Sequence, residues 1–260
     1  MTGKKTLTIL KIGGRLVEDE ALLADILSRF VLSEGLKILV HGGGKMTSEL
    51  CQKLGIPPKM AEGRRITDAD TLKIATMVYA GQANKNIVGK LQALGCGALG
   101  LSGADLDSIR AHKRPVANID FGFAGDIDHI NTPIIRRLLD AQITPVFCAI
   151  THDGNGQLLN TNADTIAATL AAELAPFYDV ALKFCFEKPG VLRDPEDEGS
   201  VIPSITPPVC ADYRRQGIIS EGMIPKLDNA FYALRKGVAE VRICGPEGIL
   251  CASKGTKLCL

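Results

Sequence analysis

Short apolar runs rich in β-branched residues alternate along this chain with longer amphipathic segments. The short runs have the length and composition of buried strands, and they fall at 7–12, 36–40, 144–150, 180–186 and 238–244. The longer segments have helical periodicity, and they fall at 20–33, 45–54, 69–80, 84–94, 133–141, 164–174 and 226–236. Strands that alternate with helices in this way predict an α/β fold, in which helices cover both faces of a mostly parallel sheet.

Residues 108–130 interrupt this alternation. Short β-like segments there are divided by Pro115 and by the glycines of residues 121–125 (FGFAG). We expect hairpins that project from the main sheet, either as a lid over a substrate or as a plain surface excursion. A polar, acidic loop at 193–199 precedes a further helical region. A chain of 260 residues suits one two-lobed domain or two small ones. Because the chain has no long linker, the lobes must abut, and we expect the active site of a two-substrate enzyme in a cleft between them.

The charge balance excludes several classes of partner. The 30 basic and 29 acidic residues are spread along the chain and give a net charge of +1, without the clustered basic field that nucleic acid or an anionic membrane requires. No apolar run approaches the roughly 18–20 residues that cross a bilayer, and the N-terminus lacks the apolar region of a signal peptide. We expect a cytoplasmic protein whose partners are small molecules or a second copy of itself.

The cysteines and histidines form no recognisable metal or disulfide pattern. None of the eight cysteines belongs to a CxxC motif, and several lie in apolar stretches. Such cysteines are typical of small, reduced core residues. The four histidines are scattered without metal-ligand spacing, so we expect no structural metal site.

Two predicted strands end in glycine-rich turns that lead into helices, at 10–14 (LKIGG) and 40–45 (VHGGGK). Glycines let a ligand approach the backbone, and helix N-termini suit phosphate or carboxylate oxygens. The carboxyl ends of parallel strands are also the usual place for ligands. Each turn alone can be a simple connection, but the pair, with Lys11 just before the first glycines, favours anion binding. Leu39 and Met46 exclude a Walker loop, and Thr47 excludes a dinucleotide-binding GxGxxG.

Three further segments concentrate polar residues. Residues 63–68 (GRRITD) offer a guanidinium suited to a carboxylate, or simply a solvated arginine pair. Residues 160–164 (NTNAD) open an apolar helix and contain more polar groups than one helix cap requires. Lys226 follows Pro225 in the first turn of a helix, where a cation opposes the helix dipole. We expect Lys226 to face a bound anion, with a solvent-facing lysine as the alternative.

Taken together, these segments resemble the amino-acid kinase superfamily and, within it, the acetylglutamate kinases. The matching motifs occur in order over nearly the whole chain, at 11–14 (KIGG), 41–44 (HGGG), 63–67 (GRRIT), 77–81 (MVYAG) with 84–85 (NK), 160–164 (NTNAD) and 222–226 (GMIPK). The resemblance implies a three-layer αβα sandwich of the carbamate kinase-like type, with two lobes. Residues 1–176 would bind the acyl amino acid and form a dimer interface, and residues 177–260 would bind the nucleotide.

The resemblance also implies roles for individual residues. Lys11 and Lys226 would neutralise charge on the transferring phosphoryl group, and Asp164 would orient both lysines. The binding residues would be Gly13 and Gly14 with Lys226 at the nucleotide phosphates, Gly43 and Gly44 at the reacting carboxylate, Arg65 at the substrate α-carboxylate, and Asn160 on the same molecule.

The implied reaction is ATP-dependent, Mg²⁺-assisted phosphorylation of the γ-carboxylate of N-acetyl-L-glutamate in arginine biosynthesis. A glutamate side chain, with a reference pKa of about 4.3, is already ionised at neutral pH. No general base is therefore needed, and positioning with charge stabilisation suffices. The alternatives are N-succinyl-L-glutamate as substrate, another kinase of the superfamily, or a non-catalytic nucleotide-binding or storage protein.

Some residues depart from the family pattern. Cys185 and Phe186 replace a Ser/Thr-Asp pair, so base and ribose contacts are not assigned in residues 182–192. Glu221 replaces a common glycine and should point away from the ATP phosphates. The cations available to a succinyl carboxylate are Arg110, Lys113 and Arg114, which can equally be surface charges. The first strand begins at Leu7, which leaves no room for the N-terminal helix of arginine-inhibited hexamers. We expect a homodimer without arginine feedback.

Overall fold

An eight-stranded sheet forms the middle layer of the molecule. The computed structural model describes residues 3–61, 63–219 and 222–260. Across the sheet lie β12 (Ser204–Ile205), β14 (Thr256–Leu258), β13 (Glu240–Cys244), β11 (Asp179–Cys185), β1 (Thr6–Ile12), β2 (Leu36–His41), β8 (Thr144–Phe147) and β5 (Ala98–Leu101). Neighbouring strands are parallel except for β13 and β14. The predicted α/β fold with a mainly parallel sheet is confirmed.

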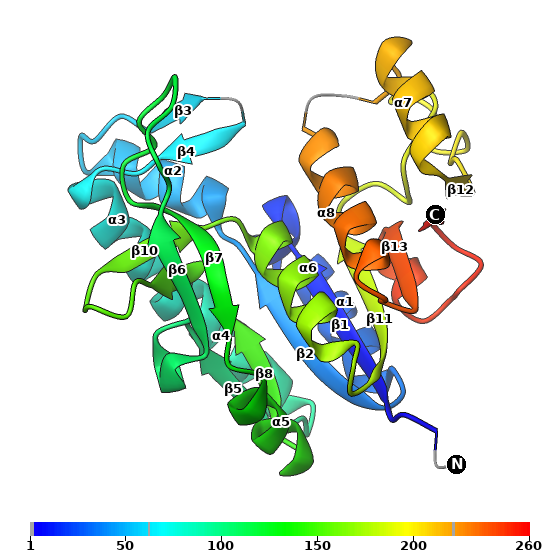
Figure 1. Cartoon of the computed structure of the whole chain (residues 1–260), viewed down its shortest axis with the longest axis horizontal. Helices are drawn as coiled ribbons and strands as arrows, with labels where there is room; N and C mark the ends of the chain where they lie inside the picture. The colour runs from blue at the N-terminus through cyan, green and yellow to red at the C-terminus, as the bar shows by residue number, and fades with distance from the viewer. Residues whose placement is uncertain (1–2, 62, 220–221) are drawn as a thin grey trace.

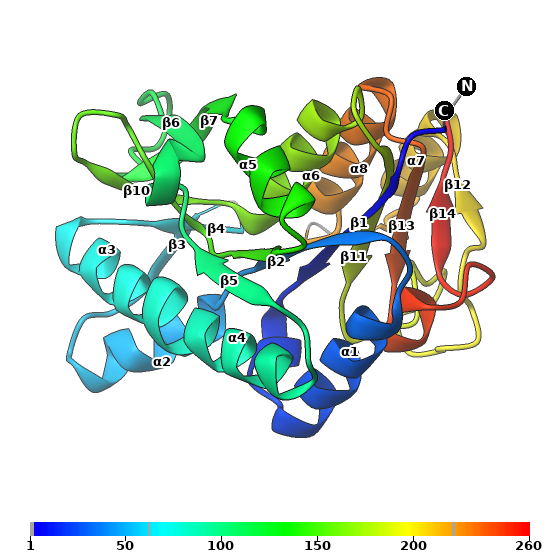
Figure 2. The same ribbon diagram turned by 90° about the horizontal axis from the view of Figure 1, so that it is seen from below.

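Helices cover both faces of this sheet (Figures 1 and 2). On one face lie α1 (Glu20–Leu32) and α4 (Asn84–Ala93), and on the other lie α5 (Thr132–Asp140), α6 (Ala163–Leu174) and α8 (Ile224–Arg235). The shorter helices are α2 (Gly44–Lys53), α3 (Ala69–Thr76) and α7 (Pro207–Arg215). Side chains that accept amide hydrogen bonds set several helix starts, namely Asp19 before α1, Asp68 before α3, Asn131 before α5 and Asn162 before α6.

The alternation of side chains along β1 decides where the first lysine points. Leu7 and Ile9 pack in the core cluster that contains the buried residues of α6 and α8. Leu10 and Ile12 pack in the opposite cluster, with α1 and α4. Because successive residues of a strand face opposite sides of the sheet, Lys11 shares the side of Leu7 and Ile9. The strand therefore presents a buried lysine to α6 at its carboxyl end.

A second, closed four-stranded sheet accounts for the interruption at residues 108–130. It contains β6 (Ile109–Lys113), β7 (Ala124–Ile130), β9 (Ile150–His152) and β10 (Leu158–Thr161). The expected hairpin outside the main sheet is present as β6 and β7. It is one hairpin, however, and it pairs with β9 and β10 to form a separate sheet. The predicted strand 144–150 is likewise split, since β8 pairs within the main sheet and Ile150 pairs with β10.

The helix predicted at 69–80 continues beyond α3 as a π-helical segment, η2 (Met77–Ala83), and runs on into α4. A π-helical turn inserts an extra residue into an α-helix and shifts the faces of everything after it. Tyr79 within this segment and Asn84 directly after it are both buried. Tyr79 contacts the second glycine turn, and Asn84 contacts the histidine that precedes it.

The cysteines are all free. Five are buried, Cys96 and Cys259 are half-buried, and Cys251 is exposed. The prediction that these residues belong to the core is therefore wrong for Cys251. None of the described helices is long and apolar enough to cross a membrane.

Candidate active site

Two adjacent cavities meet at the first glycine turn. Ile12 pairs with His41, so β1 and β2 end at the same level and both glycine turns lie at the carboxyl end of the sheet. The larger cavity of the two, of about 230 Å³, is bordered by both turns, by Arg65 and Asn160, and by the start of α6. The second cavity, of about 220 Å³, extends toward Lys226 and the start of α8. Lys11, Gly13 and Gly14 line both cavities.

Asp164 lies between the two predicted lysines. Its Oδ1 is 2.6 Å from Lys11 Nζ, and its Oδ2 is 3.3 Å from Lys226 Nζ. Burial opposes ionisation of this carboxyl, but the two ammonium groups outweigh burial and lower the pKa of Asp164 below its ordinary value. The carboxylate is therefore ionised at neutral pH, and it holds cations from β1 and α8 at one place.

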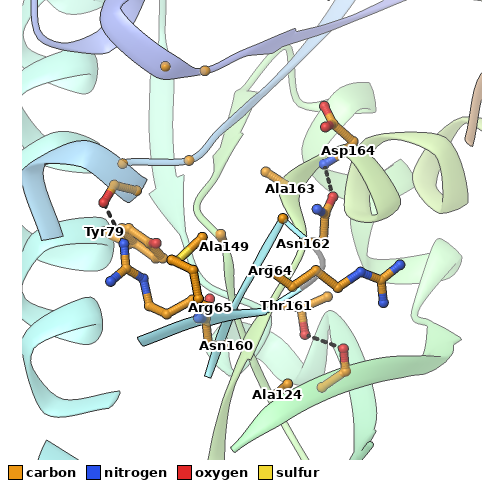
Figure 3. Close-up of a pocket in the computed structure, with 18 of the residues that line it drawn as sticks. Arg64, Arg65, Tyr79, Ala124, Ala149, Asn160, Thr161, Asn162, Ala163 and Asp164 are labelled. Carbon is orange, nitrogen blue, oxygen red and sulfur yellow. Dashed lines mark hydrogen bonds between the residues drawn. The ribbon is translucent and has the colours of Figure 1, made fainter. Parts of the chain in front are cut away.

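The start of α6 explains why Asp164 is free for this role. Asn162 precedes the helix, and its Oδ1 accepts hydrogen bonds from the amides of Asp164 at 2.8 Å and Thr165 at 3.1 Å. The first of these bonds is drawn in Figure 3. Since Asn162 caps the helix, the Asp164 side chain is available to the lysines, and Asn160 is available to line the cavity.

The first glycine turn is tightly fitted around Lys11. A Cβ at Gly13 would lie 2.7 Å from Lys11 Nζ, so a side chain there would displace the ammonium group. Gly14 has a φ of 61°, in the left-handed region that favours glycine. The next amide, that of Arg15, donates to Glu187 Oε1 at 2.8 Å. The turn thus presents a backbone amide to an anionic oxygen.

Arg65 reaches the cavity from a two-stranded hairpin, β3 (Lys59–Ala61) and β4 (Arg64–Ile66). Its Nη2 donates to Gly44 O at 2.6 Å and to Ser48 Oγ at 2.7 Å. Its Nη1 is buried and has no acceptor in the part of the chain that the structure describes. The guanidinium is therefore fixed at one end, and its other end has donors suited to a carboxylate.

Asn160 also lines this cavity and contacts the residue that follows the hairpin. It belongs to β10, and its Nδ2 donates to Thr67 Oγ1 at 3.0 Å. The side chain is thereby aligned beside the segment that carries Arg65. Figure 3 shows Arg64 and Arg65 extending to opposite sides of the hairpin, as neighbouring residues of a strand do.

The structure separates the three cations considered in residues 108–130. Arg114 lines the larger cavity and forms an ion pair with Asp126, with Nε 3.0 Å from Oδ2. This arginine lowers the pKa of Asp126. Arg110 pairs with Asp107 instead, and the ammonium of Lys113 lies 5.3 Å from the centre of the Phe123 ring. Of the hairpin's cations, Arg114 is the one at the cavity.

The divergent segment after β11 borders a third hollow, of about 170 Å³. Its apolar lining comes from that segment and from the approach to α8, and comprises Phe186, Val191, Leu192, Ile218, Ile219 and Met223 among others. The expectation that Glu221 points away from the phosphates lies outside the described residues.

Sequence reasoning missed the role of Tyr79. A Cβ at Gly43 would lie 2.9 Å from the Tyr79 ring, so this ring sets how closely the second glycine turn packs. Tyr79 lines the larger cavity and is visible beside Arg65 in Figure 3. Because Tyr79 reaches the turn through a π-helical segment, regular helical periodicity would not have placed it there.

His41, at the end of β2, is fully buried. Burial lowers its pKa from 6.5 to about 4, opposed by a hydrogen bond to Gly42 O and assisted by the charge of Lys85. The folded protein thus resists protonation of this ring, whereas the unfolded chain accepts the proton below its ordinary pKa of 6.5. Stability from His41 is complete above that value, and it is lost as the pH falls to about 4.

We therefore expect His41 alone to lower the free energy of unfolding by about 3 kcal/mol between pH 7 and pH 4. Urea unfolding of the wild type and of His41→Asn at several pH values measures this contribution as the difference between the two pH dependences. Identical pH dependences in the two proteins would contradict it.

The chain is similar to members of one protein family over nearly its whole length. Residues 6–245 match the model of the amino acid kinase family. An acetylglutamate kinase from Phocaeicola vulgatus is 53% identical over 240 residues, 92% of this chain and 93% of that protein. One from Parabacteroides distasonis is 51% identical over 252 residues, 97% and 98% of the respective chains. The crystal structure of smu.665 from Streptococcus mutans UA159 superposes with a TM-score of 0.80 at 25% identity, covering 97% of this chain and 98% of the other.

Proposed function

The chain belongs to the amino acid kinase family, and from this membership we propose that it phosphorylates the γ-carboxylate of N-acetyl-L-glutamate with ATP. The product is an acyl phosphate, and the reaction is a step of arginine biosynthesis. The observation that carries the proposal is the junction of two cavities at Lys11, Gly13 and Gly14, beside a carboxylate that holds two lysines. Two anionic substrates can enter from opposite sides and meet at these cations.

The charges at the junction fit this reaction. Both the nucleophilic carboxylate and the nucleotide are negative, so their approach requires cations and amide donors more than it requires a base. Lys11 and Lys226 provide the cations and Asp164 fixes their positions. The glycine turns and the N-terminus of α2, which starts at Gly44, add backbone amides at the same edge.

The larger cavity is suited to the amino acid. Arg65 would bind the α-carboxylate through its unengaged end, and Asn160 would hold the same molecule, with Gly43 and Gly44 near the reacting carboxylate. The support for this assignment is that all four residues line one cavity with Lys11.

The second cavity is suited to the ATP phosphates, with Gly13, Gly14 and Lys226 as their ligands and the apolar hollow around Phe186 nearby for the base. The described residues contain no group of three or more His, Cys, Asp or Glu placed to hold a metal ion, and Asp164 is engaged by two lysines. Mg²⁺ would therefore enter on the ATP phosphates, as part of the substrate.

We also propose the predicted lobes, with residues 1–176 for the acyl amino acid and 177–260 for the nucleotide. The support is that the larger cavity is lined from residues 11–164 and the apolar hollow from residues 186–223, while Lys11, Gly13 and Gly14 of the first lobe reach the second cavity. We also propose a cytoplasmic homodimer. In support of self-association, β5 forms an edge of the main sheet and exposes Leu99, and an unpaired edge strand can pair with a second chain.

Trapping of the product with hydroxylamine tests the proposed reaction. Purified protein incubated with N-acetyl-L-glutamate, ATP and Mg²⁺ should form a hydroxamate at a rate that depends on all three. Binding of ATP without hydroxamate would instead indicate a non-catalytic nucleotide-binding protein. Faster turnover with aspartate, free glutamate, carbamate or UMP would indicate another kinase of the family.

The substitution Arg65→Lys should raise the KM for N-acetyl-L-glutamate by at least tenfold and leave the KM for ATP within about twofold. A lysine has one compact ammonium group and cannot bind Gly44 O, Ser48 Oγ and a carboxylate through a planar fork. Steady-state kinetics with each substrate varied in turn provides the measurement. Equal changes in the KM values for N-acetyl-L-glutamate and ATP would show that Arg65 does not bind the amino acid specifically.

N-succinyl-L-glutamate is a second candidate substrate, because the larger cavity is lined by Arg64 and Arg114 in addition to Arg65. A succinyl group has a further carboxylate, which a guanidinium binds well. The ratio of kcat/KM for the two acyl substrates decides between them. A succinyl preference that disappears in Arg114→Gln would assign the extra carboxylate to that residue.

A further inference from the structure

His41 is held in a single protonation and tautomeric state by the carbonyl of the next residue and by a side chain from a distant part of the chain. Its Nδ1 lies 2.8 Å from Gly42 O, and its Nε2 lies 3.0 Å from Asn84 Nδ2. A carbonyl oxygen can only accept a hydrogen bond, and an amide nitrogen can only donate one. The ring is therefore neutral, with its proton on Nδ1 and its lone pair on Nε2 directed at Asn84.

The Nδ1 hydrogen bond determines the orientation of one peptide group in the second glycine turn. The acceptor is the carbonyl of the peptide between Gly42 and Gly43. In a planar, trans peptide the C=O and the N–H point in opposite directions. With the carbonyl held toward the buried ring, the Gly43 N–H is directed away from the ring, and both Gly42 and Gly43 line the larger cavity. No protein atom of the described residues accepts this amide hydrogen.

A hydrogen bond is needed there because glycine has no side chain that could set the orientation of the peptide. Three successive glycines leave the backbone of this turn with few steric restrictions. The Tyr79 ring limits how far the turn can move toward the core, since it lies against Gly43. Contact with a ring does not select which way a peptide faces, and the His41 bond does.

Asn84 in turn has no freedom to rotate. It is 1% exposed, its Nδ2 donates to Val146 O at 2.9 Å as well as to His41, and its Oδ1 accepts from Lys85 Nζ at 3.1 Å. A Cβ at Gly100 would lie only 1.9 Å from Asn84 Oδ1, so the neighbouring strand is shaped around this amide. The chain of contacts runs from β5 and β8 through Asn84 and His41 to the glycine turn.

We propose that His41, supported by Asn84, is a positioning residue that holds the Gly42–Gly43 peptide so that the Gly43 N–H donates to the oxygens that gain charge during phosphoryl transfer. This inference rests on the proposed kinase function. It gives a positioning role to two motif residues, His41 before the three glycines and Asn84 after the π-helical segment. Neither residue lines either cavity of the candidate site.

The substitutions His41→Gln and His41→Asn separate the hydrogen bond from the bulk of the side chain. The asparagine amide nitrogen falls near the position of Nδ1, whereas the longer glutamine reaches the position of Nε2 and leaves Gly42 O without its donor. We expect kcat to fall at least thirtyfold in His41→Gln and no more than about fivefold in His41→Asn. The Kd for N-acetyl-L-glutamate and the KM for ATP should stay within about threefold of the wild type in both.

Asn84→Ala tests the same arrangement by removing the hydrogen bond to His41 Nε2. We expect kcat to fall at least tenfold in this variant. Equal losses of kcat in the two His41 variants, or turnover of Asn84→Ala within threefold of the wild type, would overturn the proposal. Urea midpoints show which variants are folded at the assay temperature, and Asn84→Ala decides the question if His41→Gln is not. Lack of turnover in the wild type would count against the kinase function instead, so the two failures are distinguishable.

Discussion

Replacing Lys226 by alanine should lower kcat about a thousandfold, while the Kd for N-acetyl-L-glutamate changes by less than about threefold. The physical reason lies in where the ammonium group stands. Lys226 lines the second cavity together with Gly13 and Gly14, but it does not line the larger cavity that contains Arg65 and Asn160. We propose that its charge stabilises the phosphoryl group in the transition state of the transfer, which lowers kcat when the charge is lost and leaves binding of the amino acid unchanged.

Lys45→Ala provides the matched control. Like Lys226, Lys45 lies in the first turn of a helix at the edge of the sheet, because α2 starts at Gly44. Its ammonium pairs with Glu18 at 3.1 Å and is half exposed, and it lines neither cavity of the candidate site. We expect kcat of Lys45→Ala to stay within about twofold of the wild type. Near-normal turnover of Lys226→Ala, or an equal loss in Lys45→Ala, would contradict the assignment of Lys226.

The parts of the site that sequence reasoning could predict are those that depend on local pattern. A glycine turn after a buried strand can be recognised within a few residues, and so can a lysine after a proline at a helix start. The structure brings Lys11, Asp164 and Lys226 together. It also places Gly13, Gly14, Gly43, Gly44, Arg65 and Asn160 around the two cavities.

The parts that it could not predict depend on contacts between distant segments. Asn160 and Thr67 are 93 residues apart in the chain, and Asn84 and Val146 are 62 apart. The division of residues 144–150 between the main sheet and the closed sheet also depends on distant segments, because the strands that pair with these residues lie elsewhere in the sequence. The roles of Tyr79 and Asn84 were also hidden by the π-helical turn, because that turn breaks the regular spacing on which helical faces are read.

The substitution Asp164→Asn should lower kcat by at least a thousandfold and should also destabilise the protein. An amide has the same shape as the carboxylate but no charge, so Lys11 would remain buried without a counter-ion. Removing one member of a buried ion pair typically costs about 3–5 kcal/mol, and the Lys11 side chain is only 9% exposed. We expect the free energy of unfolding, measured with urea at pH 7, to fall by about 3 kcal/mol.

Asp70→Asn is the control for the stability change, because Asp70 pairs with Lys73 at 3.0 Å and both side chains are exposed. An exposed ion pair contributes about 1 kcal/mol or less, so this variant should unfold close to the wild type and retain its kcat. A similar loss of stability in both variants would indicate that burial of the Asp164–Lys11 pair has no special weight.

A double-mutant cycle distinguishes an organising role of Asp164 from a direct one. If Asp164 acts by holding the two lysines in place, its loss already misplaces Lys226, and removing Lys226 as well adds little. The double variant Asp164→Asn with Lys226→Ala should then lose much less than the product of the two single losses in kcat, as neighbouring residues that act as one unit do. Multiplicative losses would mean that Asp164 contacts the reacting groups independently, and its role as an organiser of the lysines would have to be abandoned.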